Sequence, residues 1–254
     1  MQDMPFFANR LRRDASRVVG DRLAAIKSQS GATLLRAPWS NGTHDVADTK
    51  ADAPMFLETA HTTMPIEFQG REIMMEAHAY EDESASYQAM AVVHRVKNGA
   101  APEVPLVRLH SGCVTGDIFH SMRCDCYQQL QKALERIVDS HFGIIIYLPY
   151  HEGRGIGLVK KLQAYAAQDK GLDTVDANLS VGAPVDSRDY ELAAKILKDL
   201  GVRDVRLMTN NPLKVEALRG HGIEVSEQVP HIVKPSAHNA KYLATKRERM
   251  AHKL

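Results

Sequence analysis

The chain has only three cysteines, one tryptophan and no long hydrophobic run, and these scarcities exclude several classes of protein. An odd number of cysteines argues against the disulfide framework that small secreted domains use. No apolar run approaches the ~18 residues that a membrane-spanning helix needs. A formal net charge of +1 over 254 residues creates no overall field that would attract nucleic acid or an anionic membrane. We therefore expect a soluble globular protein with neither a nucleic-acid nor a membrane partner.

The N-terminus also lacks the features of a targeting segment. The stretch MQDMPFFANRLRRDASRVV has no apolar core of the kind found in secretory signals. It is basic and amphipathic, but Asp3 and Asp14 argue against a transit peptide. Free thiols are typical of reducing compartments. We therefore expect a cytoplasmic protein.

The few cysteines that are present lie close together in the sequence HSGCVTGDIFHSMRCDC, at Cys113, Cys124 and Cys126. Thiolate ligands suit zinc better than they suit magnesium or calcium. Catalytic zinc usually has three protein ligands and leaves a fourth position for water. If residues 124–126 are extended, the two thiols at positions i and i+2 point to one face and can bind the same ion. We predict a catalytic zinc site with one open position.

Other interpretations of these cysteines stay open at this point. A closed structural zinc site would need a fourth ligand, and His110 and His120 are available. Three buried cysteines without a metal would be ordinary, although they would have no need to cluster. Two other classes of zinc enzyme are not favoured. The H-x-E and P-C-x-x-C motifs of nucleobase deaminases are absent, and His151-Glu152 lacks the second histidine of a metalloprotease.

The order of hydrophobic patterns predicts an α/β protein with a layered sheet covered by helices. We expect an N-terminal helical extension and linker over residues 1–60, with a helix at 7–29 and a polar loop at 40–54, and a catalytic domain over 61–254. The expected strands are 66–80, 87–96, 105–111, 143–150, 204–210 and 223–229. The expected helices are 127–140, 155–171, 187–201, 212–222 and a basic C-terminal helix with a solvated charged face.

Four element boundaries carry recognisable residues. Ser187 is a candidate N-cap for the helix that follows it. Gly171 and Gly201 are placed where glycine commonly ends a helix. Pro212 suits the first turn of its helix.

A glycine-rich turn, HEGRGIG at 151–157, follows a predicted buried strand and opens a predicted helix. Glycines let backbone N–H groups approach a ligand, and a helix N-terminus favours anions. Arg154 offers a planar fork for a phosphate, and Glu152 offers a carboxylate for paired N–H donors such as a guanine edge. An ordinary tight turn with a surface ion pair is the alternative interpretation.

Two further segments place charges at predicted helix starts. VDSRDY contains Asp186 and Arg188, and TNNPLK contains Lys214. Ligands in open α/β sheets bind beyond the carboxyl ends of strands. We expect the glycine-rich turn and both of these segments to meet at such ends, although an acidic N-cap and a solvated arginine would explain VDSRDY equally well.

Together, four segments of the chain closely resemble the GTP cyclohydrolase II family, which opens riboflavin synthesis. They are RLHSGCVTGDIFHSMRCDC, EGRGIGLVKKLQAYAAQDKGLDTVDAN, DSRDY and VRLMTNNPLKVEAL. The resemblance extends from about residue 104 to the C-terminus. It implies a mixed layered sheet with helices and a zinc-dependent hydrolysis of GTP. The implied products are formate, pyrophosphate and 2,5-diamino-6-(5-phosphoribosylamino)pyrimidin-4-one.

The resemblance also implies roles for individual residues. Cys113, Cys124 and Cys126 would bind one zinc ion per subunit. Asp186 matches the position called the proton acceptor, Arg188 the position called the nucleophile toward the α-phosphate, and Tyr165 a tyrosine near the reacting imidazole ring. The implied GTP-binding residues are Arg108, Leu109, His110, Ser111, Gly112, Gln129, Glu152, Gly153, Arg154, Thr174, Thr209 and Lys214. Mg²⁺ bound to the triphosphate and a homodimer are implied as well.

One implied role conflicts with elementary chemistry. An arginine stays protonated at ordinary pH and is therefore a poor nucleophile. We interpret Arg188 first as a clamp that stabilises charge at the α-phosphate.

The chain departs from the usual family pattern at a few positions. Gly112 replaces a glutamate, Tyr127 a glycine, and Tyr150-His151 an Arg-Gln pair. These changes favour a retuned pocket, and two alternatives follow from them. The chain could be a diverged paralogue that keeps the formyl group or uses another nucleotide in a different pathway. It could also be a non-catalytic zinc-stabilised binding module, although such a module would not need Tyr165, Asp186 and Arg188 together.

Overall fold

The computed structural model describes residues 58–249, except for 83–85 and 97–103. The helix expected at 7–29 and the loop expected at 40–54 lie outside the described residues. The proposed division of the chain at residue 60 therefore stays a prediction. None of the described helices is both long enough and apolar enough to span a membrane.

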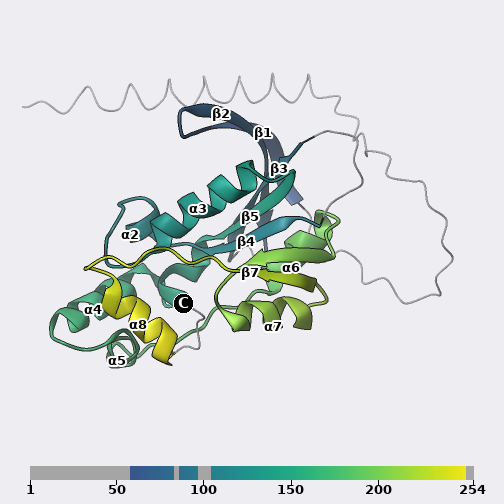
Figure 1. Ribbon diagram of the computed structural model, residues 1–254. Coiled ribbons are helices and arrows are strands. Elements are labelled where there is room, and N and C mark those ends of the chain that lie inside the picture. Colours follow the sequence, from purple (N-terminus) through teal and green to yellow (C-terminus); the bar gives the residue numbers. More distant parts are fainter. Residues whose placement is uncertain (1–57, 83–85, 97–103, 250–254) are drawn as a thin grey trace, which may run out of the picture. The chain divides into compact units, whose positions relative to one another are not determined.

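The described residues form one seven-stranded mixed sheet with the strand order β1-β2-β3-β5-β4-β6-β7 (Figure 1). The strands are β1 (Glu58–Phe68), β2 (Arg71–Glu81), β3 (Gln88–Arg95), β4 (Leu106–Ser111), β5 (Phe142–Leu148), β6 (Asp204–Met208) and β7 (Glu224–Val229). The pairs from β1 through β3 to β5 are antiparallel, and those joining β5, β4, β6 and β7 are parallel. The predicted α/β class with a mixed sheet is confirmed.

The segment 66–80, expected as one strand, turns back on itself. Gln69 and Gly70 have φ angles of 52° and 73°, which makes a tight turn between β1 and β2. A two-residue turn of this kind matches the right-handed twist of a hairpin. The expectation of a continuous strand here was wrong because its alternating pattern runs on through the polar turn.

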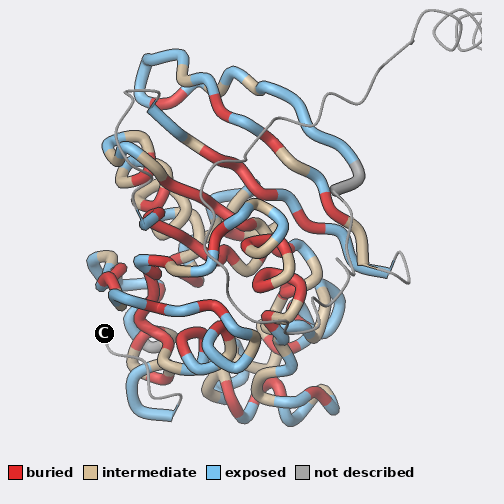
Figure 2. The backbone as a smooth tube through the Cα atoms, turned by 90° about the vertical axis from the view of Figure 1, so that its right-hand side faces the viewer, coloured by how far each residue is buried: buried red, intermediate tan, exposed pale blue. Residues whose placement is uncertain are grey.

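Helices cover both faces of the parallel half of the sheet. On one face, α6 (Glu191–Asp199) and α7 (Pro212–Gly220) pack against residues such as Val107 and Ile144. On the other face, α3 (Cys126–Val138) packs against Leu106 and Ile145. Successive strand residues point to opposite faces, which explains this alternation. Burial is greatest along the central strands and least along the edge strand β1 (Figure 2).

The remaining helices gather beyond the carboxyl ends of the parallel strands (Figure 1). They are the short α2 (Val114–Asp117), the 3-10 turn η1 (Pro149–Arg154), α4 (Gly157–Asp169), α5 (Thr174–Ser180) and α8 (Ala240–Arg249). Asp173 caps α5, with its carboxylate accepting from the N–H groups of Val175 and Asp176. Neither α2 nor α5 was expected, because both are too short to show clear helical periodicity.

The expected helix boundaries hold in part. Gly171 and Gly201 follow their helices with φ angles of 104° and 74°, as predicted, and Pro212 is the first residue of α7. The predicted N-cap at Ser187 was wrong, because α6 begins at Glu191 after Tyr190. The Ser187 hydroxyl instead donates to the carbonyl oxygen of Arg154, at 3.1 Å.

Gly112 lies where the end of β4 passes closest to the end of β5. Its N–H donates to the Leu148 carbonyl at 2.9 Å, and a Cβ at this position would lie 2.8 Å from the Pro149 Cα. We predict that Gly112→Ala lowers the free energy of unfolding by about 1–3 kcal/mol, the usual cost of overpacking. Urea unfolding measures this change.

Gly220 provides the matched control, because a Cβ there meets no atom within 4 Å. Gly220→Ala should leave stability unchanged or raise it by up to about 1 kcal/mol through helix propensity. Equal effects of the two substitutions would show that the close approach at Gly112 does not constrain the fold.

Candidate functional site

A pocket opens beyond the carboxyl ends of β4, β5 and β6, and it collects most of the residues predicted to be functional. Those that line it are Cys113, Cys124, Cys126, Arg108, His110, Ser111, Gly112, Gln129, Gly153, Arg154, Tyr165, Thr174, Arg188, Thr209 and Lys214. Three predicted residues do not line it, namely Leu109, Glu152 and Asp186. Each of these three contacts a residue that does.

One feature of the expected arrangement was wrong. The segment 185–190 does not follow a strand, because it joins α5 to α6. It reaches the pocket as irregular chain, where the Ser187 N–H donates to the Arg154 carbonyl at 3.1 Å. The glycine-rich turn after β5 and the 209–214 segment after β6 do follow strand ends, as predicted.

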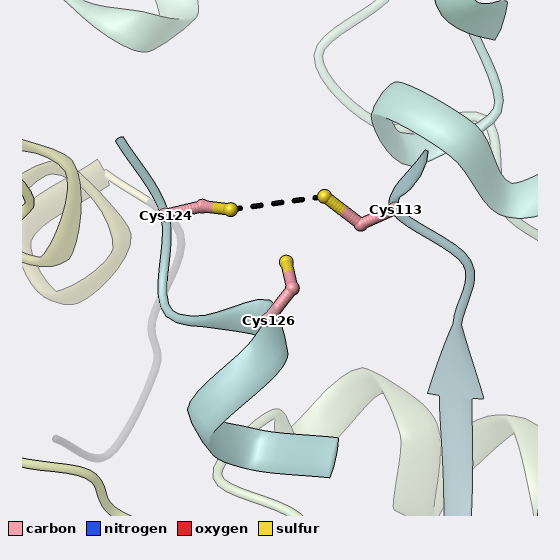
Figure 3. A group of neighbouring side chains, drawn as sticks. All are labelled: Cys113, Cys124 and Cys126. Carbon is pink, nitrogen blue, oxygen red and sulfur yellow. Dashed lines mark hydrogen bonds between the residues drawn. The ribbon is translucent and has the colours of Figure 1, made fainter. Parts of the chain in front are cut away.

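The three cysteine sulfur atoms converge on one point, although they come from different elements (Figure 3). Cys113 precedes α2, Cys124 lies in the following loop, and Cys126 is the first residue of α3. All three Sγ atoms lie within 4.8 Å of one another, and those of Cys113 and Cys124 are 3.7 Å apart. The expectation of an extended segment at 124–126 was wrong, because the chain turns into a helix there and brings the thiols together by that turn.

The geometry of the sulfur atoms fits a zinc ion. Tetrahedral zinc with Zn–S bonds of about 2.3 Å would hold its sulfur ligands roughly 3.8 Å apart. Hydrogen bonds from Cys124 and Cys126, opposed by burial and helped by Lys161, lower the pKa of Cys113 far below that of a free thiol. The pKa of Cys124 rises to about 11 because Cys124 donates to Cys113. One thiolate is thus available to start metal binding.

Neither histidine considered as a fourth ligand joins this cluster. Among the described residues, the three cysteines form the one group of potential metal ligands. His110 directs Nε2 at the Asp117 carboxylate, at 3.1 Å. The His120 ring stacks on Tyr127, with 3.8 Å between the ring centroids. The arrangement therefore favours a metal with an open fourth position over a closed structural site.

A buried lysine balances the charge of the sulfur cluster. Lys161 Nζ lies 3.0 Å from Cys113 Sγ and 2.6 Å from a carboxylate oxygen of Glu152. The other oxygen of Glu152 accepts from the Val114 N–H at 2.6 Å. Burial opposes the charge of Lys161, but Tyr165 and Cys113 outweigh it and raise the Lys161 pKa. Glu152, expected to meet a ligand directly, is instead engaged with the chain itself.

Two further basic side chains that line the pocket are buried, and neither makes a salt bridge with a carboxylate of the described residues. Lys214 Nζ donates to the Leu109 carbonyl at 2.8 Å, and Arg108 donates to the Met208 carbonyl at 2.9 Å and to Gln129. Burial lowers the pKa of Arg108 to about 10, and it lowers that of Lys214 well below its ordinary value. A bound anion would relieve this cost, because burying an unpaired charge is unfavourable.

Arg154 has an unsatisfied guanidinium. Its two terminal nitrogen atoms are buried, and they find no hydrogen-bond partner among the described residues. The residue has a φ of 68°, in the left-handed region between Gly153 and Gly155. Unpaired donors in a pocket are rare unless a ligand or water completes them, so Arg154 is well placed to bind an anion.

Arg188 and Asp186 form a paired unit at the pocket edge. The guanidinium donates to both carboxylate oxygens, at 2.9 and 2.5 Å. Burial raises the pKa of Asp186, but the bonds from Arg188 outweigh burial and lower it below the ordinary value. Asp186 therefore stays ionised at neutral pH and holds the arginine fork in a fixed orientation.

The departures from the family pattern divide into two groups. Gly112 and His151 line the pocket, whereas Tyr127 and Tyr150 do not. Burial first, and then Lys214 and Arg188, lowers the pKa of His151 to about 3, so this ring is neutral at pH 7. Its Nδ1 lies 3.2 Å from the Ser111 hydroxyl.

Several pocket residues were not predicted. They are Asp125, Ile156, Lys161, Ala164, Gln168, Asn178, Asn210, Asn211, Tyr242 and Lys246, together with His151. The C-terminal helix was expected to present a solvated charged face, and for Lys246 this was wrong, because its side chain is only 12% exposed. For Asp125, its position between two predicted metal ligands was the feature of the sequence that could have indicated a place in the pocket.

Comparison with known proteins shows a consistent similarity. Residues 58–230 match the family model described as GTP cyclohydrolase II. The chain is 54% identical over 178 residues to the GTP cyclohydrolase-2 of Streptomyces coelicolor, which covers 70% of this chain and 79% of that relative. It is 46% identical over 179 residues to the riboflavin biosynthesis protein RibBA of Aquifex aeolicus, covering 70% of this chain and 44% of RibBA. It is 55% identical over 149 residues to RibBA of Nocardia farcinica, covering 59% of this chain and 36% of that protein. The chain thus spans less than half of these RibBA relatives.

We predict that Lys161→Met weakens zinc binding about tenfold or more, because a hydrogen bond to a charged group contributes about 1.5–3 kcal/mol. A zinc ion bound by three thiolates still carries a net negative charge, and Lys161 is the cation in contact with the cluster. Competition with a chromophoric chelator measures the dissociation constant.

Lys160→Met is the matched control on the same helix. Lys160 is exposed, and its Nζ donates to the Gly182 carbonyl over a long distance of 3.4 Å. An equal loss of zinc affinity in both variants would show that Lys161 acts through general charge and not through its contact with Cys113.

Proposed function

The chain belongs to the GTP cyclohydrolase II family, as the sequence predicted, and from this premise we propose that it opens the guanine imidazole ring of GTP. The proposed products are formate, pyrophosphate and 2,5-diamino-6-(5-phosphoribosylamino)pyrimidin-4-one. The observation that carries the proposal is the shared pocket of three converging thiols and several buried cations. A purine and its triphosphate need these two kinds of group at one place.

Cys113, Cys124 and Cys126 would hold the zinc ion, which supplies an activated water for hydrolysis at C8 of guanine. Tyr165 lies beside this cluster, with Lys161 Nζ 5.8 Å from its ring centroid. Burial, opposed by Lys161, raises the pKa of Tyr165 above that of free tyrosine. The phenol therefore stays protonated at neutral pH and donates a hydrogen bond or a proton to the opening ring.

The triphosphate is proposed to bind Arg188 and two basic residues that make no salt bridge with a carboxylate of the described residues. Arg154 offers two guanidinium nitrogen atoms without a hydrogen-bond partner among the described residues, and Lys214 offers a buried amino group. Arg188 presents a fork fixed by Asp186, which suits stabilisation of charge at the α-phosphate. In this proposal Asp186 orients Arg188. Mg²⁺ bound to the phosphates would neutralise the part of the triphosphate charge that these three residues do not.

The other GTP contacts are proposed for residues that share the same pocket. They are Arg108, His110, Ser111, Gly112, Gln129, Gly153, Thr174 and Thr209. Leu109 contributes through its carbonyl oxygen, which fixes Lys214, and Glu152 contributes by holding Lys161. These two residues therefore support the site without lining it.

Assembly and location are proposed on less specific grounds. We propose a homodimer, and α4 has the exposed apolar residues Leu158, Val159 and Leu162 that such an interface could cover. All three cysteines are unpaired thiols, which is consistent with a reducing compartment such as the cytoplasm.

The activity is tested by incubating the purified chain with GTP and Mg²⁺ and measuring formate, pyrophosphate and the product mass. We expect formate and pyrophosphate from the zinc-loaded protein. Removal of zinc by a chelator should abolish formate release, and added zinc should restore it. A formylated product with pyrophosphate would favour the alternative of a diverged paralogue. Absence of turnover by the zinc-loaded protein would contradict enzymatic function and favour a binding module.

The clamp role of Arg188 is tested by two substitutions. Arg188→Met should reduce pyrophosphate release by roughly 10²–10³-fold, the usual effect of removing an electrostatic donor. Arg188→Lys should reduce it less, because lysine keeps the charge but loses the planar fork that Asp186 holds. Zinc content should stay at the wild-type level in both. A phosphoramidate adduct on Arg188, found by mass spectrometry of the wild-type protein, would contradict the clamp role.

A further inference from the structure

Helix α8 supplies part of the pocket wall although it lies beyond the residues that the family model matches. The match ends at residue 230, and α8 spans Ala240–Arg249. Tyr242 and Lys246 of α8 line the same pocket as the three cysteines. Figure 1 shows α8 beside α4 and α5, far along the sequence from the zinc-binding segments.

Lys246 makes an ion pair with Asp125, the residue between two cysteines of the candidate zinc site. Its Nζ lies 3.0 Å from the Asp125 carboxylate, and the two side chains are 12% and 1% exposed. Asp125 stands between Cys124 and Cys126 in the chain and occupies the N-cap position of α3. A movement of Asp125 therefore moves the backbone that carries both thiols.

Asp125 also connects Lys246 to the pocket floor. Its second carboxylate oxygen accepts from the side-chain amide nitrogen of Gln129, and the side-chain amide oxygen of Gln129 accepts from Arg108. Arg108 in turn donates to the Met208 carbonyl at the end of β6. A continuous set of hydrogen bonds thus joins α8 to α3, β4 and β6 through Asp125.

Other contacts hold α8 in place around this ion pair. Lys246 Nζ lies 4.4 Å from the centroid of the Tyr242 ring, and the Arg154 guanidinium lies 5.9 Å from the same centroid. At the end of the helix, Arg249 pairs with Asp173 and Asp176 on α5, and its distance to Asp176 is 3.1 Å. The Arg249 pairs are exposed and contribute little. The buried pair at Asp125 is the contact of α8 that lies next to two of the cysteines in the chain.

We propose that Lys246 is a positioning residue of the zinc site, which holds the Cys124–Cys126 turn in place through Asp125. Helix α8 is then a functional part of the site. Without Lys246, the Asp125 carboxylate would be buried beside three thiolates with no cation in contact, and such a group moves or draws in water. The turn would then hold Cys124 and Cys126 less firmly against the metal.

The principal test measures zinc release from the full-length protein to the chelator 4-(2-pyridylazo)resorcinol. We expect Lys246→Met to accelerate release about tenfold or more, in line with the effect of removing groups that orient metal ligands. Lys246→Arg should release zinc at a rate close to that of the wild-type protein, because arginine keeps a buried cation opposite Asp125. The matched control is Arg247→Met, since Arg247 is exposed on the same helix and, within the described part of the chain, pairs only with its neighbour Glu248.

A double substitution separates this pair from general damage to the helix. Asp125→Asn should also accelerate release, and adding Lys246→Met to Asp125→Asn should change the rate little further, because residues in one interaction are not additive. Should Lys246→Met fail to fold, Lys246→Arg and Asp125→Asn carry the comparison alone. Zinc release at the wild-type rate from Lys246→Met, or equal acceleration by Arg247→Met, would overturn the proposal.

A kinetic measurement extends the test to catalysis, and that extension rests on the proposed function. With zinc at saturation, Lys246→Met should lower kcat for GTP about tenfold, with a smaller change in KM. If Lys246→Met releases zinc faster than the wild-type protein, but the wild-type protein leaves GTP intact, the proposed function is contradicted and this inference stands. If the wild-type protein turns over GTP, and Lys246→Met has the wild-type kcat and zinc-release rate, the proposed function stands and this inference is contradicted.

Discussion

Three ionisable sulfur atoms are held within 4.8 Å of one another in a protein interior, and this electrostatic constraint accounts for much of what surrounds them. Like charges at such distances repel strongly where water is excluded. Lys161 contacts Cys113 directly, and its carboxylate partner Glu152 holds the first turn of α2. Lys246 forms an ion pair with the buried carboxylate of Asp125. The residues beside the thiols are therefore a set of matched charges, and a metal ion would complete their neutralisation.

Elsewhere in the pocket, basic side chains are not matched by carboxylates of the described residues. Arg154 and Lys214 make no salt bridge with a carboxylate among the described residues, and burial lowers the pKa of Lys214. Protein interiors seldom keep such groups unless they have a function. A nucleoside triphosphate fits this distribution, because its purine can approach the metal while its phosphates meet the cations. The fold brings both regions together, since β4, β5 and β6 end at the same edge of the sheet.

Much of this site could be predicted from local sequence. Clustering of Cys113, Cys124 and Cys126 indicated zinc, and the glycine-rich turn and Lys214 indicated an anion, because each depends on residue type and short spacing. Other expectations were wrong for physical reasons. Ser187 was expected to cap a helix, but tertiary contact with Arg154 engages its hydroxyl instead. Residues 124–126 were expected to be extended, but packing of α3 against the sheet starts a helix at Cys126.

The sequence by itself determined the α/β class, the family and the chemical types of the ligands, because periodicity and short motifs are properties of neighbouring residues. Only the tertiary structure decided that Glu152 and Asp186 each hold a cation in place, and that Lys246 of the C-terminal helix reaches Asp125 across 121 positions of the chain. Such pairings depend on which buried charges the fold brings into contact. A single sequence carries no local signal for contacts between residues so far apart along the chain.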